Sequence, residues 1–272
     1  MPNLSIGEPE LQPSSDLLHL ASLRIAGVLS ICLLLTSCPS RNAANFNIVG
    51  FDYLPAQTKD EVIAHTHYVL AYAEAHEQAA WVAYELTPAE TAVNLDREGN
   101  FREDPQVSTG SASLADYRGS GYDRGHLAPV GDMNFDEVAM EESFYMSNIS
   151  PQKRAFNGGI WSRLENQVRK WANEKGGIYV VTGPVLGNTE RTIGENKVTV
   201  PDFFYKVLLS KRGNQSQMIG FMLPNRASDD DLWTYAERVD NIEAYTGLDF
   251  FPALDDSTEK QLESEVRTEN WF

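Results

Sequence analysis

The stretch GYDRGHLAP, residues 121–129, places an acid, an arginine and a histidine close together in a chain that has five histidines. Arg124 and His126 are two positions apart, so on a strand they would share one side, with Asp123 on the other. A neutral imidazole can accept a proton from water near pH 7, and a guanidinium can hold a phosphate through two parallel hydrogen bonds. These residue types could do acid–base chemistry on a phosphate, although a histidine at a strand end can also be purely structural.

A second polar set follows, because Asn157 precedes the strongest helical pattern of the chain and Glu165 comes eight positions later. On a continuous helix, at about 100° per residue, Asn157, Trp161 and Glu165 would share one broad face. An amide oxygen and a carboxylate two turns apart suit a hydrated Mg²⁺, which keeps most of its waters and takes few protein ligands. Taken separately, Asn157 could be only a helix N-cap and Glu165 only a solvated acid.

Apolar patterns indicate the elements that must position these residues. YVLAYAEA and AAWVAYELT, joined by HEQ, predict a β-hairpin. Three later runs, IYVVTGPVL, FFYKVLLSK and SQMIGFMLP, predict further strands. Residues 158–177 predict a helix that a glycine pair ends, and residues 228–247 predict a second helix with Ser228 as N-cap and acids in its first turn. The mixture predicts an α+β fold with a mainly antiparallel central sheet and helices on its faces. The late acids of residues 255–269 suggest a solvated tail.

The first forty residues have a different composition. An uncharged apolar run of eleven residues, Ile25–Leu35, ends shortly before Cys38. That run is too short to span a bilayer but suits a signal peptide, and the small residues before Cys38 resemble a lipobox. We therefore expect a signal peptide over residues 1–38, lipidation at Cys38, a polar tether over residues 39–47 and a folded domain over residues 48–272. A plain secretory signal and an uncleaved buried helix are the alternatives. The expected location is a bacterial periplasm or cell surface, with a lipid anchor in the membrane.

The formal net charge is −17, which argues against a polyanionic partner, because non-specific nucleic-acid binding normally uses a basic patch. Screening beyond about 8–10 Å still allows a local group of cations to dominate inside a cleft. Arginines near the two polar sets could form such a group.

Taken together, YDRGHLAP and SNISPQKRAFNGGIWSRLE resemble the DNA/RNA non-specific endonuclease family, the ββα-metal (His-Me finger) group that includes Serratia nuclease and endonuclease G. The resemblance continues in WVAYELT, DREGNFREDP, IYVVTGPVL and YTGLDFFPAL, and it covers about residues 66 to 255. It implies a ββα-metal motif, DNA and RNA as substrates, and Mg²⁺ as cofactor with Mn²⁺ as a substitute. It also implies 5′-phosphate products and little sequence preference.

The resemblance also implies a role for each matched residue. His126 matches the general base, and Asn157 matches the direct protein ligand of the metal. Glu165 matches the acid that reaches the metal through water, and Arg97 matches the arginine at the scissile phosphate. The further substrate-binding and supporting positions are Arg124, Arg169, Asp123 and Trp161. Pro105 stands where some family members have a lysine, so one phosphate contact is absent from the pattern.

Two other functions are compatible with the sequence. One is a catalytically silent nucleic-acid-binding lipoprotein, and the other is a phosphodiesterase that acts on a non-nucleic substrate. The simultaneous presence of His126, Asn157, Glu165 and Arg97 argues against a silent protein. Whether the chain is a monomer or a homodimer, and whether an inhibitor protein binds it, stay open.

Overall fold

The computed structural model describes residues 53–56, 59–96, 99–187, 189–212 and 215–271. The chain separates into residues 1–42 and residues 43–272, and all described residues belong to the second part. The expected signal peptide, Cys38 and the polar tether lie outside the described residues. Among the described helices, none combines the length and the apolar character that crossing a membrane requires.

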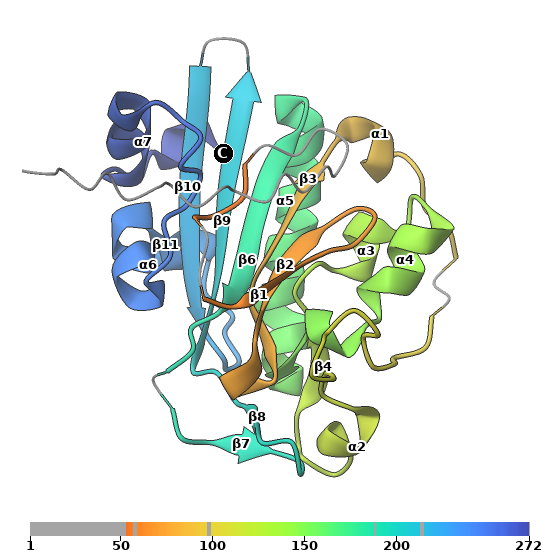
Figure 1. Cartoon of the computed structure of the whole chain (residues 1–272). Helices are drawn as coiled ribbons and strands as arrows, with labels where there is room; N and C mark the ends of the chain where they lie inside the picture. The colour runs from red at the N-terminus through yellow and green to blue at the C-terminus, as the bar shows by residue number, and fades with distance from the viewer. Residues whose placement is uncertain (1–52, 57–58, 97–98, 188, 213–214, 272) are drawn as a thin grey trace, which may run out of the picture. The chain divides into compact units, whose positions relative to one another are not determined.

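A seven-stranded sheet forms the centre of the fold (Figure 1). Its strands lie in the order β1-β2-β3-β6-β9-β10-β11, and each neighbouring pair is antiparallel. This confirms the predicted antiparallel sheet and the predicted hairpin, which is formed by β2 and β3. The strands are β1 (Glu61–Ala64), β2 (Val69–Ala73), β3 (Gln78–Leu86), β6 (Ile178–Pro184), β9 (Phe203–Arg212), β10 (Gln215–Pro224) and β11 (Ala236–Glu237).

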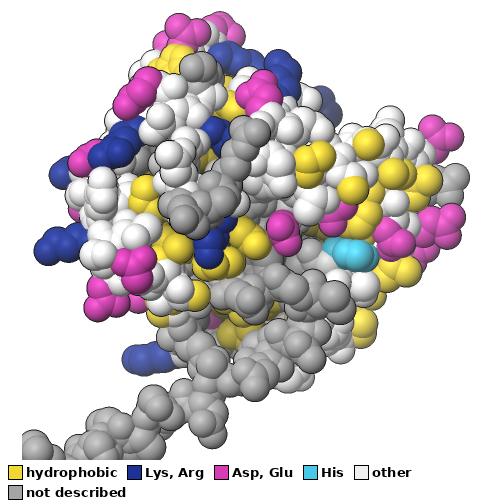
Figure 2. All heavy atoms as spheres, turned by 90° about the horizontal axis from the view of Figure 1, so that it is seen from above, with side chains coloured by type: hydrophobic (Ala, Val, Ile, Leu, Met, Phe, Trp, Pro, Cys, Tyr) yellow, Lys and Arg dark blue, Asp and Glu magenta, His cyan; other side chains and the backbone are white. Residues whose placement is uncertain are grey.

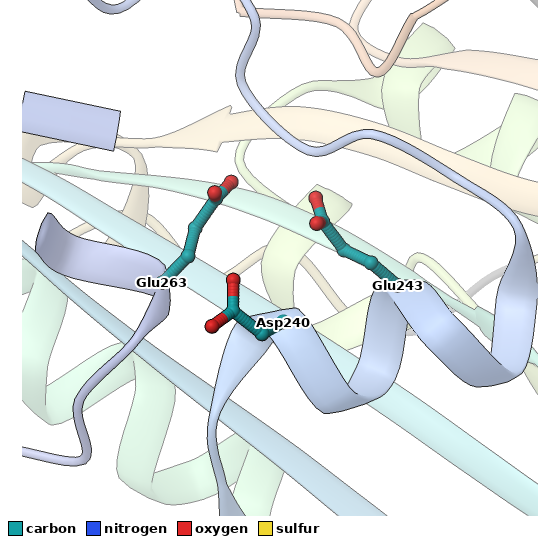
Figure 3. Close-up of side chains that lie close together, drawn as sticks. All are labelled: Asp240, Glu243 and Glu263. Atoms are coloured by element: carbon teal, nitrogen blue, oxygen red, sulfur yellow. The ribbon is translucent and has the colours of Figure 1, made fainter. Parts of the chain in front are cut away.

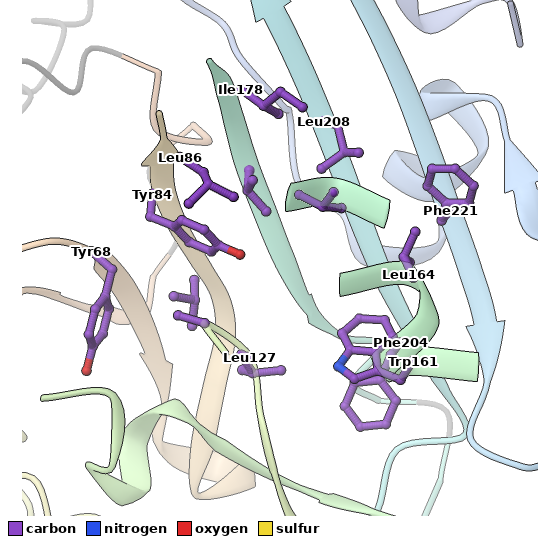
Figure 4. Close-up of a cluster of buried hydrophobic side chains, with 14 of the residues drawn as sticks. Tyr68, Tyr84, Leu86, Leu127, Trp161, Leu164, Ile178, Phe204, Leu208 and Phe221 are labelled. Carbon is purple, nitrogen blue, oxygen red and sulfur yellow. The ribbon is translucent and has the colours of Figure 1, made fainter. Parts of the chain in front are cut away.

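Both faces of the sheet are buried, because alternate residues of its strands belong to different cores. Leu70 packs in the core that contains the apolar side of α5 (Ser162–Lys175), drawn in part in Figure 4. Its neighbour Val69 packs in the other core, which α6 (Val239–Thr246) and α7 (Asp256–Glu263) cover. The predicted helices therefore do lie on both faces of the sheet. The helix α5 ends where Gly176 takes the left-handed conformation, with φ of 77°, which favours glycine.

A short antiparallel ribbon stands apart from the large sheet and leads into α5. It pairs β4 (Asp123–His126) with β5 (Ile149–Gln152), and η3 (Phe156–Trp161) then joins β5 to α5. The order is therefore strand, strand, helix. A second ribbon pairs β7 (Thr192–Ile193) with β8 (Val198–Thr199). The remaining short helices are η1 (Glu74–His76), α1 (Pro88–Thr91), α2 (Leu114–Tyr117), α3 (Val130–Met133), α4 (Glu137–Ser143), η2 (Met146–Asn148), η4 (Leu232–Tyr235) and η5 (Thr268–Asn270).

The helix predicted over residues 228–247 is wrong in its first half. After η4 the chain forms β11, which pairs with Gly220 and Phe221 of β10, and α6 begins only at Val239. Ser228 does not cap a helix, because the next helical turn, η4, begins only at Leu232 with Asp231 as its N-cap. The apolar residues of this segment lie in a 3₁₀ turn and an edge strand instead of a helix. Pairing with a neighbouring strand can override a helical pattern in the sequence.

The predicted solvated tail of residues 255–269 is also wrong. Asp255 is the N-cap of α7, and Glu263 near the end of that helix is only 7% exposed. Farther on, the ring of Trp271 is 5.2 Å from that of Trp171, centroid to centroid. The C-terminal segment is therefore a packed part of the fold.

Candidate active site

The β4–β5 ribbon holds the histidine stretch in place. Arg124 pairs with Pro151 and His126 pairs with Ile149 in its register. A Cβ added to Gly125 would lie 2.1 Å from the side-chain Cδ of Gln152. The glycine between the arginine and the histidine is therefore required by this close approach.

Asn148 clamps the chain directly after His126, a role that the sequence did not indicate. Its Oδ1 accepts from the Ala128 N–H at 2.9 Å, and its Nδ2 donates to the carbonyls of Ala128 and Ser143 at 2.9 and 2.8 Å. Its own carbonyl accepts from the Leu127 N–H. These bonds use both donors and one acceptor position of the buried amide, so Asn148 fixes the end of β4.

His126 is 9% exposed and lies against two phenylalanine rings. Its ring centroid is 5.4 Å from that of Phe101 and 5.2 Å from that of Phe144. The guanidinium carbon of Arg124 lies 4.5 Å from the same Phe101 centroid. Arg124 and His126 therefore contact one ring, as strand alternation predicts.

The segment that carries Asn157 departs from the predicted continuous helix. Residues Phe156–Trp161 form a π-helical turn, and Gly159 has the non-helical angles φ −109° and ψ −113°. The face calculated at 100° per residue for Asn157, Trp161 and Glu165 therefore does not apply. The two glycines of this turn allow the backbone to break the helical repeat, and Trp161 is fully buried.

Asn157 is oriented by Asp123. The Asn157 Nδ2 donates to Asp123 Oδ2 at 3.3 Å, and because a carboxylate only accepts, this contact assigns the amide orientation. The Asn157 Oδ1 remains an acceptor. The Nε of Arg154 lies 3.7 Å from the other Asp123 oxygen. Asp123 therefore links β4 to the turn that carries Asn157.

A pocket of about 530 Å³ opens beside this pair and includes Asp123, Asn157, Arg118, Arg124 and Arg154 in its lining. An amide oxygen with room for water suits a hard divalent cation such as Mg²⁺ or Mn²⁺. Three arginines suit a phosphate. The donor set therefore fits the predicted cofactor and substrate class.

These arginines also answer the objection from the net charge. Acidic and basic side chains are interspersed on the face drawn in Figure 2, whereas the pocket gathers three guanidinium groups around one carboxylate. A local excess of positive charge can act over a Debye length of about 8–10 Å. The acidic composition therefore does not exclude a phosphate-bearing ligand at this site.

Glu165 does not line this pocket and belongs to a network of charges with Asp132, Arg169 and Lys206. Asp132, which is 3% exposed, accepts from the Tyr84 hydroxyl at 2.7 Å and forms an ion pair with Arg169. Burial raises the pKa of the Glu165 carboxyl, the Lys206 ammonium opposes that rise, and Asp132 adds to it. Burial in turn lowers the pKa of Lys206, which is 1% exposed. Two acids and two cations therefore balance one another in this network.

The structure divides the predicted residues between two groups. Asp123, Arg124 and Asn157 line the pocket, and His126 ends the strand that carries the first two. Glu165, Arg169 and Trp161 lie along α5 and the preceding turn, with Arg169 engaged by Asp132. Arg97 lies outside the described residues. The sequence missed Asn148, Asp132 and Lys206, because their roles depend on contacts between distant segments.

The sequence model of DNA/RNA non-specific endonucleases matches residues 43–257. The chain belongs to the DNA/RNA non-specific endonuclease family. This confirms the resemblance of the two motifs.

Individual members of the family show the extent of the similarity. Nuclease C1 of Cunninghamella echinulata var. echinulata is 37% identical over 218 residues, which cover 74% of this chain and 86% of that protein. Human mitochondrial endonuclease G is 38% identical over 202 residues, or 69% of this chain and 68% of endonuclease G. Human mitochondrial nuclease EXOG is 35% identical over 216 residues, and the match spans 59% of its length.

A solved structure agrees with the fold. The crystal structure of the EndoG/EndoGI complex, determined for the mechanism of EndoG inhibition, matches with a TM-score of 0.69 and 31% identity. The match covers 73% of this chain and 88% of that chain. The family's ββα-metal fold therefore corresponds to β4, β5 and α5 here.

The prediction of a bacterial periplasm or cell surface is wrong, because these relatives are mitochondrial nucleases and a fungal nuclease. A short apolar run before a cysteine does not by itself specify a destination. The comparisons give no support to a membrane anchor at Cys38.

Proposed function

We propose that this chain is a Mg²⁺-dependent endonuclease that hydrolyses phosphodiester bonds of DNA and RNA with little sequence or sugar preference. Mn²⁺ is the expected substitute ion, and the products carry 5′-phosphate ends. The observation that supports this function best is the pocket in which Asn157, oriented by Asp123, lies beside Arg124 and Arg154.

Each polar side chain has a task in this reaction. The Asn157 Oδ1 holds the cation, which when bound supplies Lewis-acid stabilisation of the phosphate charge. The His126 imidazole accepts a proton from the attacking water, whose oxygen bonds to phosphorus as the bond from phosphorus to the 3′ oxygen breaks. The leaving 3′ oxygen takes a proton from a water molecule and becomes a hydroxyl. The rings of Phe101 and Phe144 and the Asn148 clamp keep that imidazole in one place.

The remaining site residues act on the substrate and on the ion's surroundings. Arg97 and Arg124 hold phosphate oxygens, and the negative charge that develops there is stabilised by such preorganised donors. Glu165 orients water that hydrates the cation, and Arg169 and Trp161 support Glu165. The pocket offers arginines and no built reader of base edges among its described residues, so contacts to phosphates dominate and sequence preference is small.

Supercoiled plasmid and a structured RNA, each incubated with the purified protein and Mg²⁺, test this function. Both should be degraded, EDTA should stop the reaction, and His126→Ala should lower the rate by about 10²–10⁴-fold, the usual contribution of a general base. His76→Ala is the matched control, because His76 bonds to Thr199 and lies outside the site.

Intact plasmid and RNA under all conditions would refute the nuclease function. Equal rates for the wild type and His126→Ala would refute the assigned base. Nicks that DNA ligase can reseal directly would support 5′-phosphate ends, and nicks that need prior phosphorylation would contradict them.

A further inference from the structure

A cluster of five carboxylates lies on the opposite face of the large sheet from α5, away from the pocket. Asp240 and Glu243 come from α6, Asp249 from the segment after it, and Glu259 and Glu263 from α7. Figure 3 shows the carboxylates of Asp240, Glu243 and Glu263 pointing toward one another. We call these five residues the C-terminal acid cluster.

Oxygens of the cluster are close enough to share one ion. One oxygen each from Asp240, Glu243 and Glu263 lies within 4.8 Å of the others, and the same holds for Asp249, Glu259 and Glu263. Oxygens that bind one Ca²⁺ at 2.3–2.6 Å can be at most about 5 Å apart. Glu263 belongs to both sets, so it is the centre of the cluster.

Glu263 gives a second and independent indication of a ligand. The residue is 7% exposed, and its buried Oε1 has no hydrogen-bond partner among the described residues. The Oε1 of Glu259 is likewise buried and has no hydrogen-bond partner among the described residues. Within the described part of the chain, no ion pair reaches any of the five acids. Glu263 shares a hydrogen bond with Glu243, but a buried carboxylate oxygen without a partner is costly, so the two Oε1 atoms call for a positive charge beside them.

The electrostatics of the cluster agree with its geometry. Burial first, and then the charges of Glu243, Glu259, Asp240 and Asp249, raise the pKa of Glu263 to about 8. Burial likewise raises the pKa of Glu243 and of Glu259. The acids repel one another and attract a positive charge, which can be a proton or a metal ion.

We propose that the C-terminal acid cluster binds one divalent, oxygen-preferring cation, Ca²⁺, that joins α6 to α7. The candidate ligands in both sets of three are carboxylates, which suit a hard cation better than zinc or copper. Ca²⁺ accepts six to eight oxygens in irregular geometry, whereas Mg²⁺ demands a compact octahedron and retains several waters. The exposed acids, Asp240 and Asp249, leave room for water on the outer side.

The ion would fasten the C-terminal helices to the sheet. Between α6 and α7 the chain contributes Leu248, Phe250, Phe251 and Leu254 to the core on that face, and the Phe250 N–H donates to Glu243 Oε1 at 2.9 Å. An ion that binds only the folded protein stabilises it. Its effect is therefore on stability, and it does not depend on the proposed nuclease function.

Thermal unfolding of the full chain in the Asn157→Ala background tests the site, because this substitution removes the metal ligand of the pocket. After treatment with EDTA and buffer exchange, addition of CaCl₂ to well above its Kd should raise Tm by about 5–10 °C. The same concentration of MgCl₂ should raise it less. Calorimetric titration should give one Ca²⁺ per chain.

Glu263→Gln in the same background should abolish the Ca²⁺-dependent rise and should unfold at a higher temperature than its parent in EDTA, because a buried charge is removed. Asp240→Asn, at an exposed position, should weaken Ca²⁺ binding at least tenfold and covers the case in which Glu263→Gln does not fold. The matched control is Glu265→Gln, an exposed acid that pairs with Arg267 and should keep the full response.

The inference is overturned if Ca²⁺ leaves Tm unchanged in the Asn157→Ala parent, or if Glu263→Gln and Asp240→Asn respond as the parent does. A Tm that rises on acidification but ignores Ca²⁺ also overturns it and assigns the cluster to a shared proton. A nuclease that proves inactive with a normal Ca²⁺ response leaves this inference standing.

Discussion

Two groups of acids, each with one buried member, Asp132 or Glu263, lie on opposite faces of the same sheet, and they are balanced in different ways. Asp132 and Glu165 are accompanied by Arg169 and Lys206, one through an ion pair and the other through its buried ammonium. The C-terminal acid cluster has no such cation among the described residues. A group with built-in cations holds its geometry unaided, whereas a group without them requires a proton or an ion.

Removal of the built-in cation should have the largest effect on stability. Lys206→Met leaves Glu165 and Asp132 with one cation in place of two, and breaking a buried charge pair costs about 3–5 kcal/mol. Urea unfolding measures the loss. Lys211→Met, at an exposed position near the end of the same strand, is the control, and equal stabilities for the two variants would show that Lys206 does not balance the acids.

Glu165→Gln should affect both catalysis and stability in the same group. The cleavage rate should fall by about 10–100-fold, as for other residues that orient the surroundings of a metal, and the free energy of unfolding should fall as well, because Lys206 and Arg169 lose an opposing charge. Plasmid nicking at saturating Mg²⁺ measures the rate. Glu174→Gln, an exposed acid on α5, is the control, and a wild-type rate for Glu165→Gln would remove Glu165 from the site.

Because of the C-terminal acid cluster, the stability of the metal-free protein should depend on pH in a defined direction. The pKa of Glu263 is raised in the folded protein above its unfolded value near 4.3, so the folded state holds more protons between about pH 4 and 8. Stability of the metal-free protein should therefore fall as pH rises through that interval. The charges of the facing acids, Glu243, Glu259, Asp240 and Asp249, contribute to the raised pKa of Glu263. Urea unfolding at pH 5.5 and 8.0 should show a smaller difference for Glu263→Gln than for the wild type.

An exposed ion pair should have the smallest effect. The side chain of Arg154 is 91% exposed beside Asp123, so Arg154→Ala should change the free energy of unfolding by less than about 1 kcal/mol. Binding of DNA should weaken evenly across sequences, with the salt slope smaller by about one ion. Arg267→Ala, which breaks another exposed pair, should leave DNA binding unchanged; an unchanged salt slope for Arg154→Ala would exclude a phosphate contact.

Much of the fold could be predicted because strongly periodic segments form what their pattern indicates. The hairpin β2–β3, the strands β6, β9 and β10, and the helix α5 all follow their apolar spacing. The segment after Pro224 could not be predicted, because β11 exists only through its pairing with β10. The burial of Glu263 could not be predicted either, because an acidic amphipathic helix has the same composition as an exposed tail.

The candidate site was only partly accessible from the sequence. The DRGH motif and Asn157 could be singled out, and they lie in β4 and at the start of η3. The π-helical turn at Gly159 changed the geometry that a regular helix would give. The partners of these residues, such as Asp132 for Arg169, come from other segments, and spacing along the chain carries no information about them.

Metal-dependent cleavage is assigned to the pocket of Asp123 and Asn157 and not to the C-terminal acid cluster. The decisive measurement is the Mg²⁺-dependent rate of plasmid cleavage by Asn157→Ala. This rate should be about 10²–10³-fold lower than that of the wild type, equivalent to several kcal/mol of lost charge stabilisation, in a protein whose Tm still rises with Ca²⁺. Cleavage by Asn157→Ala at the wild-type rate and with the wild-type Mg²⁺ dependence would contradict this assignment.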